Sequence, residues 1–413
     1  MMTQQEKIQA LGRLGVDLNQ VQDLDVLMEA ILTQARRFVN ADAGSIYIRQ
    51  DGNLRFTYTQ NDTLQKRLGP GEKLIYGTFS LPVDTKSIAG FVAVTGKALA
   101  ITDAHAIPPE APYGFDKSFD SKAGYRTGSM LTLPLKNSRG NLLGVLQIIN
   151  SQDEHGRVCP FGEDDQQVMS HFGGIAAVAL ERAQMTRALL LRMISMAEMR
   201  DPKETGAHVN RVGAYSLELY ERWAARRGEN PDELARIRDS IRMAAMLHDV
   251  GKVAISDLIL KKPGRFEKDE FEIMKQHTVL GARLFLEPQS DFDEAARLVA
   301  LNHHERWDGK GYPGHVAVDT GLPLAGHILP DGQAAGKKGE EIPLLGRIVS
   351  LCDVYDALSS KRVYKEAWTE QQTLDAIMQG SGTQFDPELV ELFFGSLDVL
   401  RSIQGRYKDK TEQ

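Results

Sequence analysis

The sequence predicts a two-part fold, an N-terminal α+β unit and a C-terminal all-α unit, joined by a long helix. In the N-terminal part, apolar strands bracket short polar turns, whereas in the C-terminal half apolar residues recur every three or four positions. A proline-free stretch with helical spacing lies between them. At about 100–200 residues per domain, a chain of 413 residues also favours two or three domains.

The composition, 42% hydrophobic and 25% charged, is typical of a soluble globular protein. A net charge of −7 argues against binding to a nucleic acid polymer, which needs a basic face. We expect no membrane segment, because no apolar stretch approaches the roughly 18 residues that span a bilayer. The N-terminus lacks the apolar core of a signal peptide. Two cysteines cannot form a disulfide framework, so we expect a cytoplasmic protein with Cys352 as a buried thiol.

Two hairpins define the α+β unit. Helical periodicity over 25–39 is followed by a strand at 45–49, the turn signal Asp51-Gly52 and an alternating returning strand at 54–58. Strands at 130–135 and 142–149 flank a second polar, glycine-containing turn. A short helix and a strand at 87–104 lie between the hairpins. Hairpins with helices around them predict an antiparallel sheet covered by helices.

This order of elements, especially over 41–48, 87–103 and 128–150, resembles a GAF domain, which we assign to residues 1–172. The resemblance implies a sensory domain that holds an unknown small ligand in a pocket over the sheet.

Three residues, Asn150, Phe161 and Asp165, are similar to a signature of the GAF domains that bind cyclic nucleotides. Ser151 stands where that signature has lysine, so the match is incomplete. The alternative is a capped strand end followed by a helix start.

Residues 173–200 form the predicted linker helix. Apolar side chains three, four or seven apart make a seam along it: Val178, Met185, Leu189, Met196 and Met199. We expect this seam to pair two copies as a parallel coiled coil, although Arg182 and Arg192 interrupt it. The alternative is a single helix that packs on its own domains.

The all-α unit is assigned to residues 201–413. Apolar residues have helical spacing over several segments: 209–226, 232–247, 268–286, 291–304, 342–358 and 370–380. In such a domain, binding sites are built from side chains on facing helices.

Metal-ligating residue types accumulate at the ends of these helices. His248 and Asp249 are adjacent, and a carboxylate can bridge two metals; Glu204 and His208 lie four apart on one helical face. Further candidates follow apolar runs: His277, His303, His304 and Asp353. Five of the ten histidines lie at such positions, too much buried polarity unless a shared cation organises it. Histidine and carboxylate ligation without cysteine favours iron or manganese, with zinc possible.

The segment 303–313, HHERWDGKGYP, matches the HHExxDGxGYP signature of HD-GYP domains, and HDVGK at 248–252 supplies their other hallmark. Residues 201–400 also contain the family's other landmarks in order. The C-terminal half is therefore identified as a member of the HD-GYP family.

Membership implies hydrolysis of cyclic di-GMP to pGpG, GMP or both, with two or three divalent metal ions. The implied ligands are His208, His248, Asp249, His277, His303, His304 and Asp353, with Asp249 as the bridging carboxylate. Members with a glutamate one turn before the first histidine resemble a trinuclear subset, so Glu204 predicts a third metal. Its alternative is a helix N-terminal carboxylate stabilised by the dipole.

The resemblance also implies roles around the metals. Bound metals supply hydroxide at neutral pH and stabilise the charge on phosphorus. Lys252 is the expected catalytic and substrate-binding cation, with Asp249 as its catalytic partner. Arg362 and Lys365, in an element where Val363 replaces the usual proline, are expected to bind phosphate or guanine. Tyr312 is expected at the mouth of the site, on the substrate side.

The chain departs from the family by a glycine-rich insertion over 315–338, a length typical of lids and binding elements. It directly follows the GYP loop and could gate the site. His315 and His327 within it are not expected to be metal ligands.

Two other functions are considered. The domain could be a non-catalytic module that binds cyclic di-GMP or a partner, or an HD hydrolase of another nucleotide. The intact ligand set with Lys252 favours an enzyme, and the complete GYP element favours cyclic di-GMP.

Overall fold

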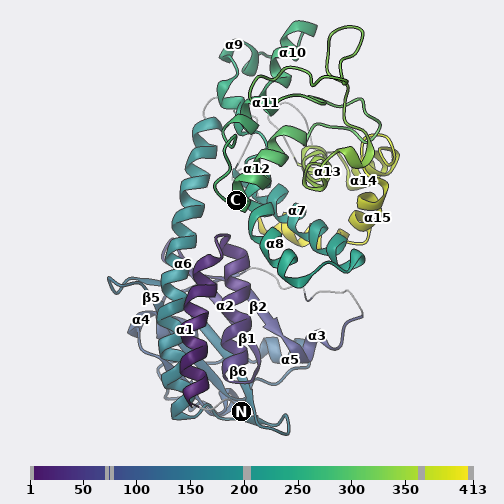
Figure 1. Cartoon of the computed structure of the whole chain (residues 1–413). Coiled ribbons are helices and arrows are strands. Elements are labelled where there is room, and N and C mark those ends of the chain that lie inside the picture. Colours follow the sequence, from purple (N-terminus) through teal and green to yellow (C-terminus); the bar gives the residue numbers. More distant parts are fainter. Residues whose placement is uncertain (1–3, 70–73, 75–78, 199–205, 361–367, 408–413) are drawn as a thin grey trace. The chain divides into compact units, whose positions relative to one another are not determined.

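The computed structural model describes residues 4–69, 74, 79–198, 206–360 and 368–407. The chain divides into two compact units, Met1–Arg187 and Ala188–Gln413 (Figure 1). Among the described residues, no helix has the length and apolar character needed to cross a bilayer.

The first unit is built on one antiparallel sheet. Its strands are β1 (Ala41–Gln50), β2 (Asn53–Asn61), β3 (Ser80–Pro82), β4 (Leu99–Ile101), β5 (Met130–Lys136), β6 (Leu142–Gln152) and β7 (Val158–Cys159). Their order is β3-β2-β1-β6-β5-β4, and β7 pairs with β6. The predicted α+β class is confirmed for this unit.

Both predicted hairpins are present. Gln50 pairs with Asn53, so Asp51 and Gly52 alone form the first turn, with φ of 50° and 81°. Positive φ at both positions gives the turn a twist that matches its strands, which is why Asp-Gly is favoured there. In the second hairpin, Lys136 pairs with Leu142 across the longer polar turn.

Helices pack on both faces of this sheet. On one face, α1 (Gln4–Gln20), α2 (Leu24–Phe38) and α6 (Glu163–Glu198) enclose the main core, where Leu27 and Phe172 pack with Leu146 (Figure 1). The short helices α3 (Asp62–Gln65) and α5 (Ser118–Ala123) and the turn η1 (Ala104–Ala106) lie in the connections. On the opposite face, α4 (Ile88–Thr95) contributes Val92 to a cluster with Tyr47 and Val145.

Helix α6 begins at Glu163, ten residues before the start of the predicted linker helix at residue 173. Gly173 and Gly174 disfavour a helix that continues through them, because glycine costs about 1 kcal/mol in a helix interior. Burial on both sides of the pair overrides that cost, since Met169 and Phe172 before it and Ala176 after it are fully buried. Helix α6 therefore forms part of the first unit's core before it continues into the second unit.

The residues similar to the cyclic-nucleotide signature have structural roles. The Asn150 side chain accepts from the Gly128 N–H and donates to the Tyr125 hydroxyl and the Arg126 carbonyl. Phe161 is buried in the core, and Asp165 accepts from the Gly162 N–H at the start of α6. The alternative of a capped strand end and a helix start therefore describes them. A cleft of about 400 Å³ in this unit is lined by Lys86 and by side chains between Ala104 and Lys117.

Every named element of the second unit's described residues is helical: α7 (Gly206–Arg227), α8 (Pro231–Met246), η2 (Val250–Ala254), α9 (Asp257–Leu260), α10 (Lys268–Lys275), α11 (His277–Arg283), α12 (Asp291–Asn302), η3 (Gly339–Glu341), α13 (Leu344–Ser359), α14 (Glu370–Gln379), α15 (Pro387–Phe394) and α16 (Leu397–Arg406). The predicted all-α class is confirmed. Cys352 is buried in this core and its thiol is free, as predicted.

The segment 268–286, predicted as one helix, is two helices that meet at Gln276. The His277 side chain donates a hydrogen bond from Nδ1 to the Met274 carbonyl, at 2.7 Å. The Gln276 N–H donates to the Ile273 carbonyl, which forms a tight turn. A side chain that competes for a backbone carbonyl interrupts the regular pattern of helical hydrogen bonds. The break aims His277 into the unit's interior.

Helix α11 and the turn η2 touch through their backbones. A Cβ on Gly251 would lie 1.9 Å from the His277 carbonyl oxygen and 2.4 Å from the Gly281 nitrogen. Only glycine fits at such a distance. The glycine of HDVGK therefore brings the His248-Asp249 pair against the helix that carries His277.

Candidate metal centre

Four side chains form the first cluster: Asp249, His277, His303 and His304. Their ligand atoms all lie within 4.8 Å of one another. They come from the turn between α8 and η2, the first residue of α11 and the turn after α12. Asp249 Oδ1 lies 3.1 Å from His277 Nε2 and 3.5 Å from His303 Nε2.

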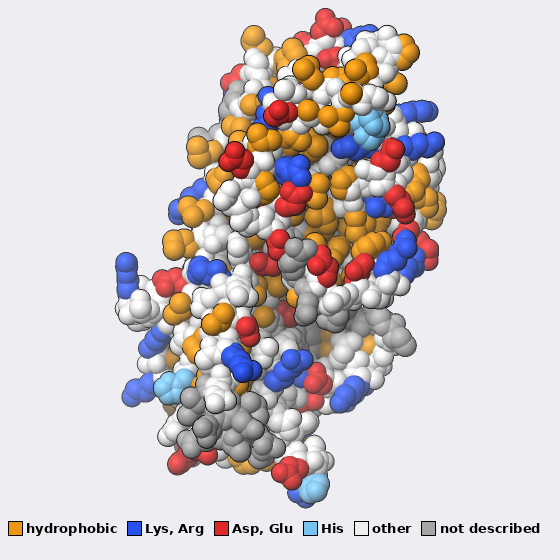
Figure 2. Space-filling view, in the orientation of Figure 1, with side chains coloured by type: hydrophobic (Ala, Val, Ile, Leu, Met, Phe, Trp, Pro, Cys, Tyr) orange, Lys and Arg blue, Asp and Glu red, His pale blue; other side chains and the backbone are white. Residues whose placement is uncertain are grey.

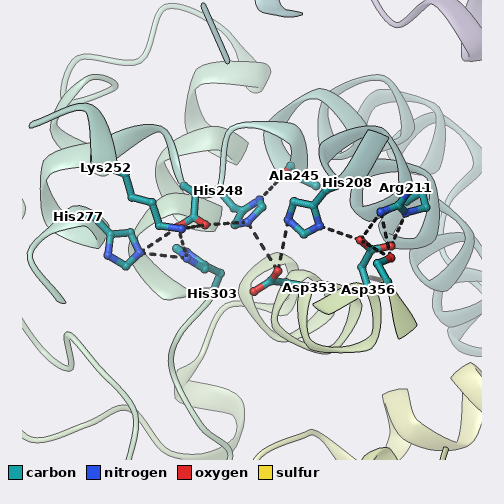
Figure 3. Close-up of polar contacts among 11 residues, drawn as sticks. His208, Arg211, Ala245, His248, Lys252, His277, His303, Asp353 and Asp356 are labelled. Atoms are coloured by element: carbon teal, nitrogen blue, oxygen red, sulfur yellow. Dashed lines mark hydrogen bonds and ion pairs between the residues drawn. The ribbon is translucent and has the colours of Figure 1, made fainter. Parts of the chain in front are cut away.

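Three side chains form the second cluster: His208 from α7, His248 from the turn between α8 and η2, and Asp353 from α13. Asp353 Oδ1 lies 3.5 Å from His208 Nε2 and 3.9 Å from His248 Nε2. Figure 3 shows the labelled side chains as a row, with His277 and His303 at one end, His248 and Asp353 in the middle and His208 beyond them.

Asp249 joins the two clusters. Its Oδ1 faces His277 and His303, while its Oδ2 lies 3.3 Å from His248 Nε2 in the second cluster. One carboxylate thus presents one oxygen to each group, an arrangement that suits a ligand shared by two cations.

Three of these histidines are hydrogen-bonded to backbone carbonyls in a way that leaves their Nε2 atoms as acceptors. His248 Nδ1 lies 2.8 Å from the Ala245 carbonyl, His277 Nδ1 lies 2.7 Å from the Met274 carbonyl, and His303 Nδ1 contacts two carbonyls of α12 at 3.1 Å. A carbonyl only accepts, so each Nδ1 must carry the proton and each Nε2 a lone pair.

These lone pairs converge. His277 Nε2 and His303 Nε2 are 3.4 Å apart, and neither can donate to the other. Asp249 Oδ1 between them is buried and makes no regular hydrogen bond. Buried acceptors that face one another are unfavourable unless a cation lies among them. The residues present therefore fit metal ions.

Burial and neighbouring charges set the protonation of this site. Burial lowers the pKa of His303 and holds that of His304 well below its usual range, so both imidazoles are neutral at neutral pH. Burial by itself would raise the pKa of Asp249, but the Lys252 ammonium 2.6 Å from its Oδ2 outweighs burial and holds that pKa well below the usual range. Neutral imidazoles and ionised carboxylates are the forms that bind metals.

Sequence reasoning missed the support behind His208. His208 Nδ1 lies 2.8 Å from Asp356 Oδ2, and Asp356 accepts two bonds from Arg211, at 2.6 and 2.9 Å (Figure 3). Burial would raise the pKa of Asp356, but the bonds from His208 and Arg211 outweigh it and lower that pKa. Asp356 lies three residues after Asp353 in α13, on the same helical face, so helical spacing could have indicated it. A carboxylate behind a ligating histidine fixes its tautomer and orientation.

The remaining predicted site residues fall into two groups, those that the structure describes and those that it does not. Lys252 lies in the site, with Nζ 2.6 Å from Asp249 Oδ2, and Tyr312 stacks on His304 with 4.8 Å between ring centroids. Glu204, Arg362 and Lys365 lie outside the described residues.

Glu305, a residue of the HHExxDGxGYP signature for which the sequence predicted no role, anchors the insertion. Its buried carboxylate accepts from the Gly314 N–H at 2.6 Å and from the Lys337 N–H at 3.2 Å, which are the two ends of the segment. Val316 and Val318 pack against α11 and α12. The insertion thus leaves and returns beside the candidate ligand pair His303-His304. His315 and His327 stack on each other at 3.8 Å and belong to neither cluster.

The fold and the site define the second unit as a helical domain with two adjoining histidine-carboxylate groups for metal ions. Residues 205–358 match the HD domain family, residues 331–389 match a second description of the HD domain, and residues 23–180 match the GAF domain family. The chain therefore carries an N-terminal GAF domain followed by an HD domain, and its HD part bears the HD-GYP signature.

Curated relatives match over the C-terminal half. The chain is 34% identical over 226 residues to 3'3'-cGAMP-specific phosphodiesterase 2 of Vibrio cholerae serotype O1, covering 55% of this chain and 38% of that protein. It is 37% identical over 225 residues to a cyclic di-GMP phosphodiesterase of the same organism, covering 53% and 41%. It is 35% identical over 234 residues to the cyclic di-GMP phosphodiesterase response regulator RpfG of Xanthomonas campestris pv. campestris, covering 55% and 56%. The chain thus spans about half or less of the length of these relatives.

The bracing of His208 predicts that Asp356→Asn weakens metal binding about 10- to 100-fold, because the imidazole loses its charged partner. The free energy of unfolding should fall by about 3–5 kcal/mol, since Arg211 is left buried without a full counter-charge. Chelator competition and urea unfolding measure the two effects. Asp398→Asn, at an exposed carboxylate of α16, is the matched control; equal metal affinity in both variants would show that Asp356 does not orient His208.

Proposed function

We propose that this chain hydrolyses cyclic di-GMP, to pGpG, GMP or both, in a metal-dependent reaction. The observation that carries the proposal is Asp249, whose two oxygens face two histidine groups of the HD domain. The relatives named as cyclic di-GMP phosphodiesterases support the substrate.

We assign metal binding to the seven residues of the two clusters, with Asp249 shared: His208, His248, Asp249, His277, His303, His304 and Asp353. A set of imidazoles and carboxylates without thiolate suits iron or manganese. Bound metals would supply charge stabilisation at the phosphoryl oxygens and a water of lowered pKa.

The chain's own groups then have defined tasks. The carbonyl-braced imidazoles keep the Nε2 atoms in place, so the site needs little rearrangement before reaction. Lys252 places its ammonium beside Asp249 and can offset negative charge on a bound phosphate. Tyr312 covers His304 and contributes an apolar wall on the substrate side. Arg362 and Lys365 are proposed to hold phosphate or guanine.

A second substrate is favoured by one observation, the relative named as specific for 3'3'-cGAMP. That molecule and cyclic di-GMP present the same phosphodiester to the metals and differ in one base. A non-catalytic role has less support, because the complete ligand set is retained beside Lys252.

Protein loaded with iron or manganese should convert cyclic di-GMP to pGpG or GMP, measured by chromatography of the products. Asp249→Ala should lower kcat by about a thousandfold, since metal charge stabilisation is worth several kcal/mol and 1.36 kcal/mol is tenfold. Asp319→Ala, in the insertion and outside both clusters, serves as control. Loaded protein that forms neither product would rule out the proposal, and full turnover in Asp249→Ala would refute the bridging role.

We further propose a third metal held with the help of Glu204. Glu204→Ala should lower the metal content from about three ions per chain to two, because the spacing of four residues predicts that Glu204 lies on the same helical face as His208. Elemental analysis of both proteins tests this. Two ions per chain in the unmutated protein would contradict it.

We also propose that the chain is a homodimer through α6 and that the GAF domain regulates the HD domain through that helix. Apolar side chains at least half exposed follow one stripe of α6: Val178, Met185, Leu189, Met193 and Met196. Their separations of seven, four, four and three residues are typical of a coiled-coil seam. Met193 is not part of the predicted seam, and the predicted Met199 lies outside the described residues. Arg182, which interrupts the predicted seam, turns away to donate to the Val21 carbonyl. Both cysteines are free, which agrees with a cytoplasmic protein.

The double variant Leu189→Glu, Met193→Glu should convert a dimer into a monomer, because buried like charges would face each other across the seam. Light scattering coupled to gel filtration measures the mass. Ser195→Glu, exposed on the same helix but off the stripe, should stay dimeric. A monomeric unmutated protein would refute the seam.

A further inference from the structure

Three rings lead from the first cluster to the protein surface. Tyr312 stacks on the ligand-cluster residue His304, with 4.8 Å between centroids and 29° between planes. Phe271 on α10 meets Tyr312 edge to face, at 6.0 Å and 80°. Phe271 is the outermost ring and is 43% exposed. The ring of Phe271 is therefore separated from the candidate metal centre by a single side chain.

A lysine accompanies these rings. Lys275, one helical turn after Phe271, places Nζ 5.6 Å from the Phe271 centroid and 5.8 Å from the Tyr312 centroid. The same Nζ pairs with Glu272 at 2.7 Å, so the ammonium is held in place on α10. The result is an exposed Phe271 ring that contacts Tyr312 edge to face and has an ammonium group fixed beside it.

Packing does not account for Phe271. Helix α10 is anchored by Met274, which is buried with Ile255, Ile259 and Leu260, and Phe271 belongs to none of the described core clusters. Hydrophobic side chains gather over this part of the second unit, where Figure 1 places α9 and α10 (Figure 2). An exposed aromatic ring held beside a candidate phosphodiester site is suited to ligand contact rather than to stability.

We propose that the ring of Phe271, supported edge to face by Tyr312 and flanked by Lys275, is a stacking platform for one purine base of the substrate. The proposal rests on the proposed function, because it needs a cyclic dinucleotide whose phosphate lies at the two clusters. The base and the phosphate of one nucleotide are separated by a single ribose. The Phe271 ring is separated from His304 by the ring of Tyr312 alone, with 6.0 Å and 4.8 Å between successive centroids. Stacking on an aromatic ring, aided by a nearby cation, is a general mode of nucleobase binding.

This platform supplies affinity without base identity, because every base has a stacking face. Guanine and adenine should therefore use it about equally. Discrimination between cyclic di-GMP and its mixed guanine-adenine analogue must come from polar contacts elsewhere in the site.

Steady-state kinetics of the full metal-loaded chain tests the platform. Phe271→Ala should raise KM about tenfold for cyclic di-GMP and by a similar factor for 3'3'-cGAMP, with kcat and metal content unchanged. Phe271→Trp should restore the KM of the unmutated protein. Ile273→Ala, an exposed apolar residue of the same helix outside the platform, should change neither constant. Lys275→Gln should raise KM at low salt but much less at high salt, because exposed charges are screened.

An unchanged KM in Phe271→Ala, or a fall in kcat by itself, would overturn the platform while leaving the proposed function intact. An effect on only one of the two cyclic dinucleotides would also overturn it, because stacking should serve both. Unmutated protein that turns over neither substrate would instead overturn the proposed function. Thermal unfolding of each variant checks that the fold is retained.

Discussion

The carboxylate of Asp249 is the interaction on which the candidate centre depends. One oxygen faces His277 and His303, the other faces His248 and Lys252, and the whole group is buried. An isolated buried carboxylate would be costly and would tend to take up a proton. Here the Lys252 ammonium holds the pKa of Asp249 low, so the carboxylate is ionised and can serve as a ligand for both clusters. Without this group the two clusters would be separate sites.

The helical fold supplies Asp249 with partners from distant parts of the chain. The backbone contact between Gly251 and Gly281 brings η2 onto α11, and the break at Gln276 turns His277 inward. Backbone carbonyls then fix the proton on each Nδ1, and on the opposite side Asp356 and Arg211 fix His208. Binding geometry is thus built into the packing of helices, which is more rigid than a site made of loops. Two segments beside the site, the GYP loop and the insertion, are not helical. The Glu305 carboxylate holds them by accepting hydrogen bonds from the Gly314 and Lys337 N–H groups.

Local patterns predicted most of the fold because they act over short distances. The Asp51-Gly52 hairpin, the α2 helix and the helical character of the second unit all follow from neighbouring residues. The two errors occurred where a distant contact outweighed a local preference. Helix α6 runs through Gly173 because flanking residues are buried in the core, and 268–286 divides because the His277 side chain takes a helical carbonyl.

By itself, the sequence determined which side chains could bind metal, since histidine and aspartate at the ends of apolar helices have few other uses in such number. It also determined the two domain classes, through the spacing of apolar residues. Only the tertiary structure decided how the candidates divide into two clusters, which carboxylate joins them, and that Asp356 and Glu305 act as supports. The physical reason is that ligand geometry depends on contacts between helices far apart in the chain, such as α7 with α13. Residue spacing constrains only neighbours on the same helix.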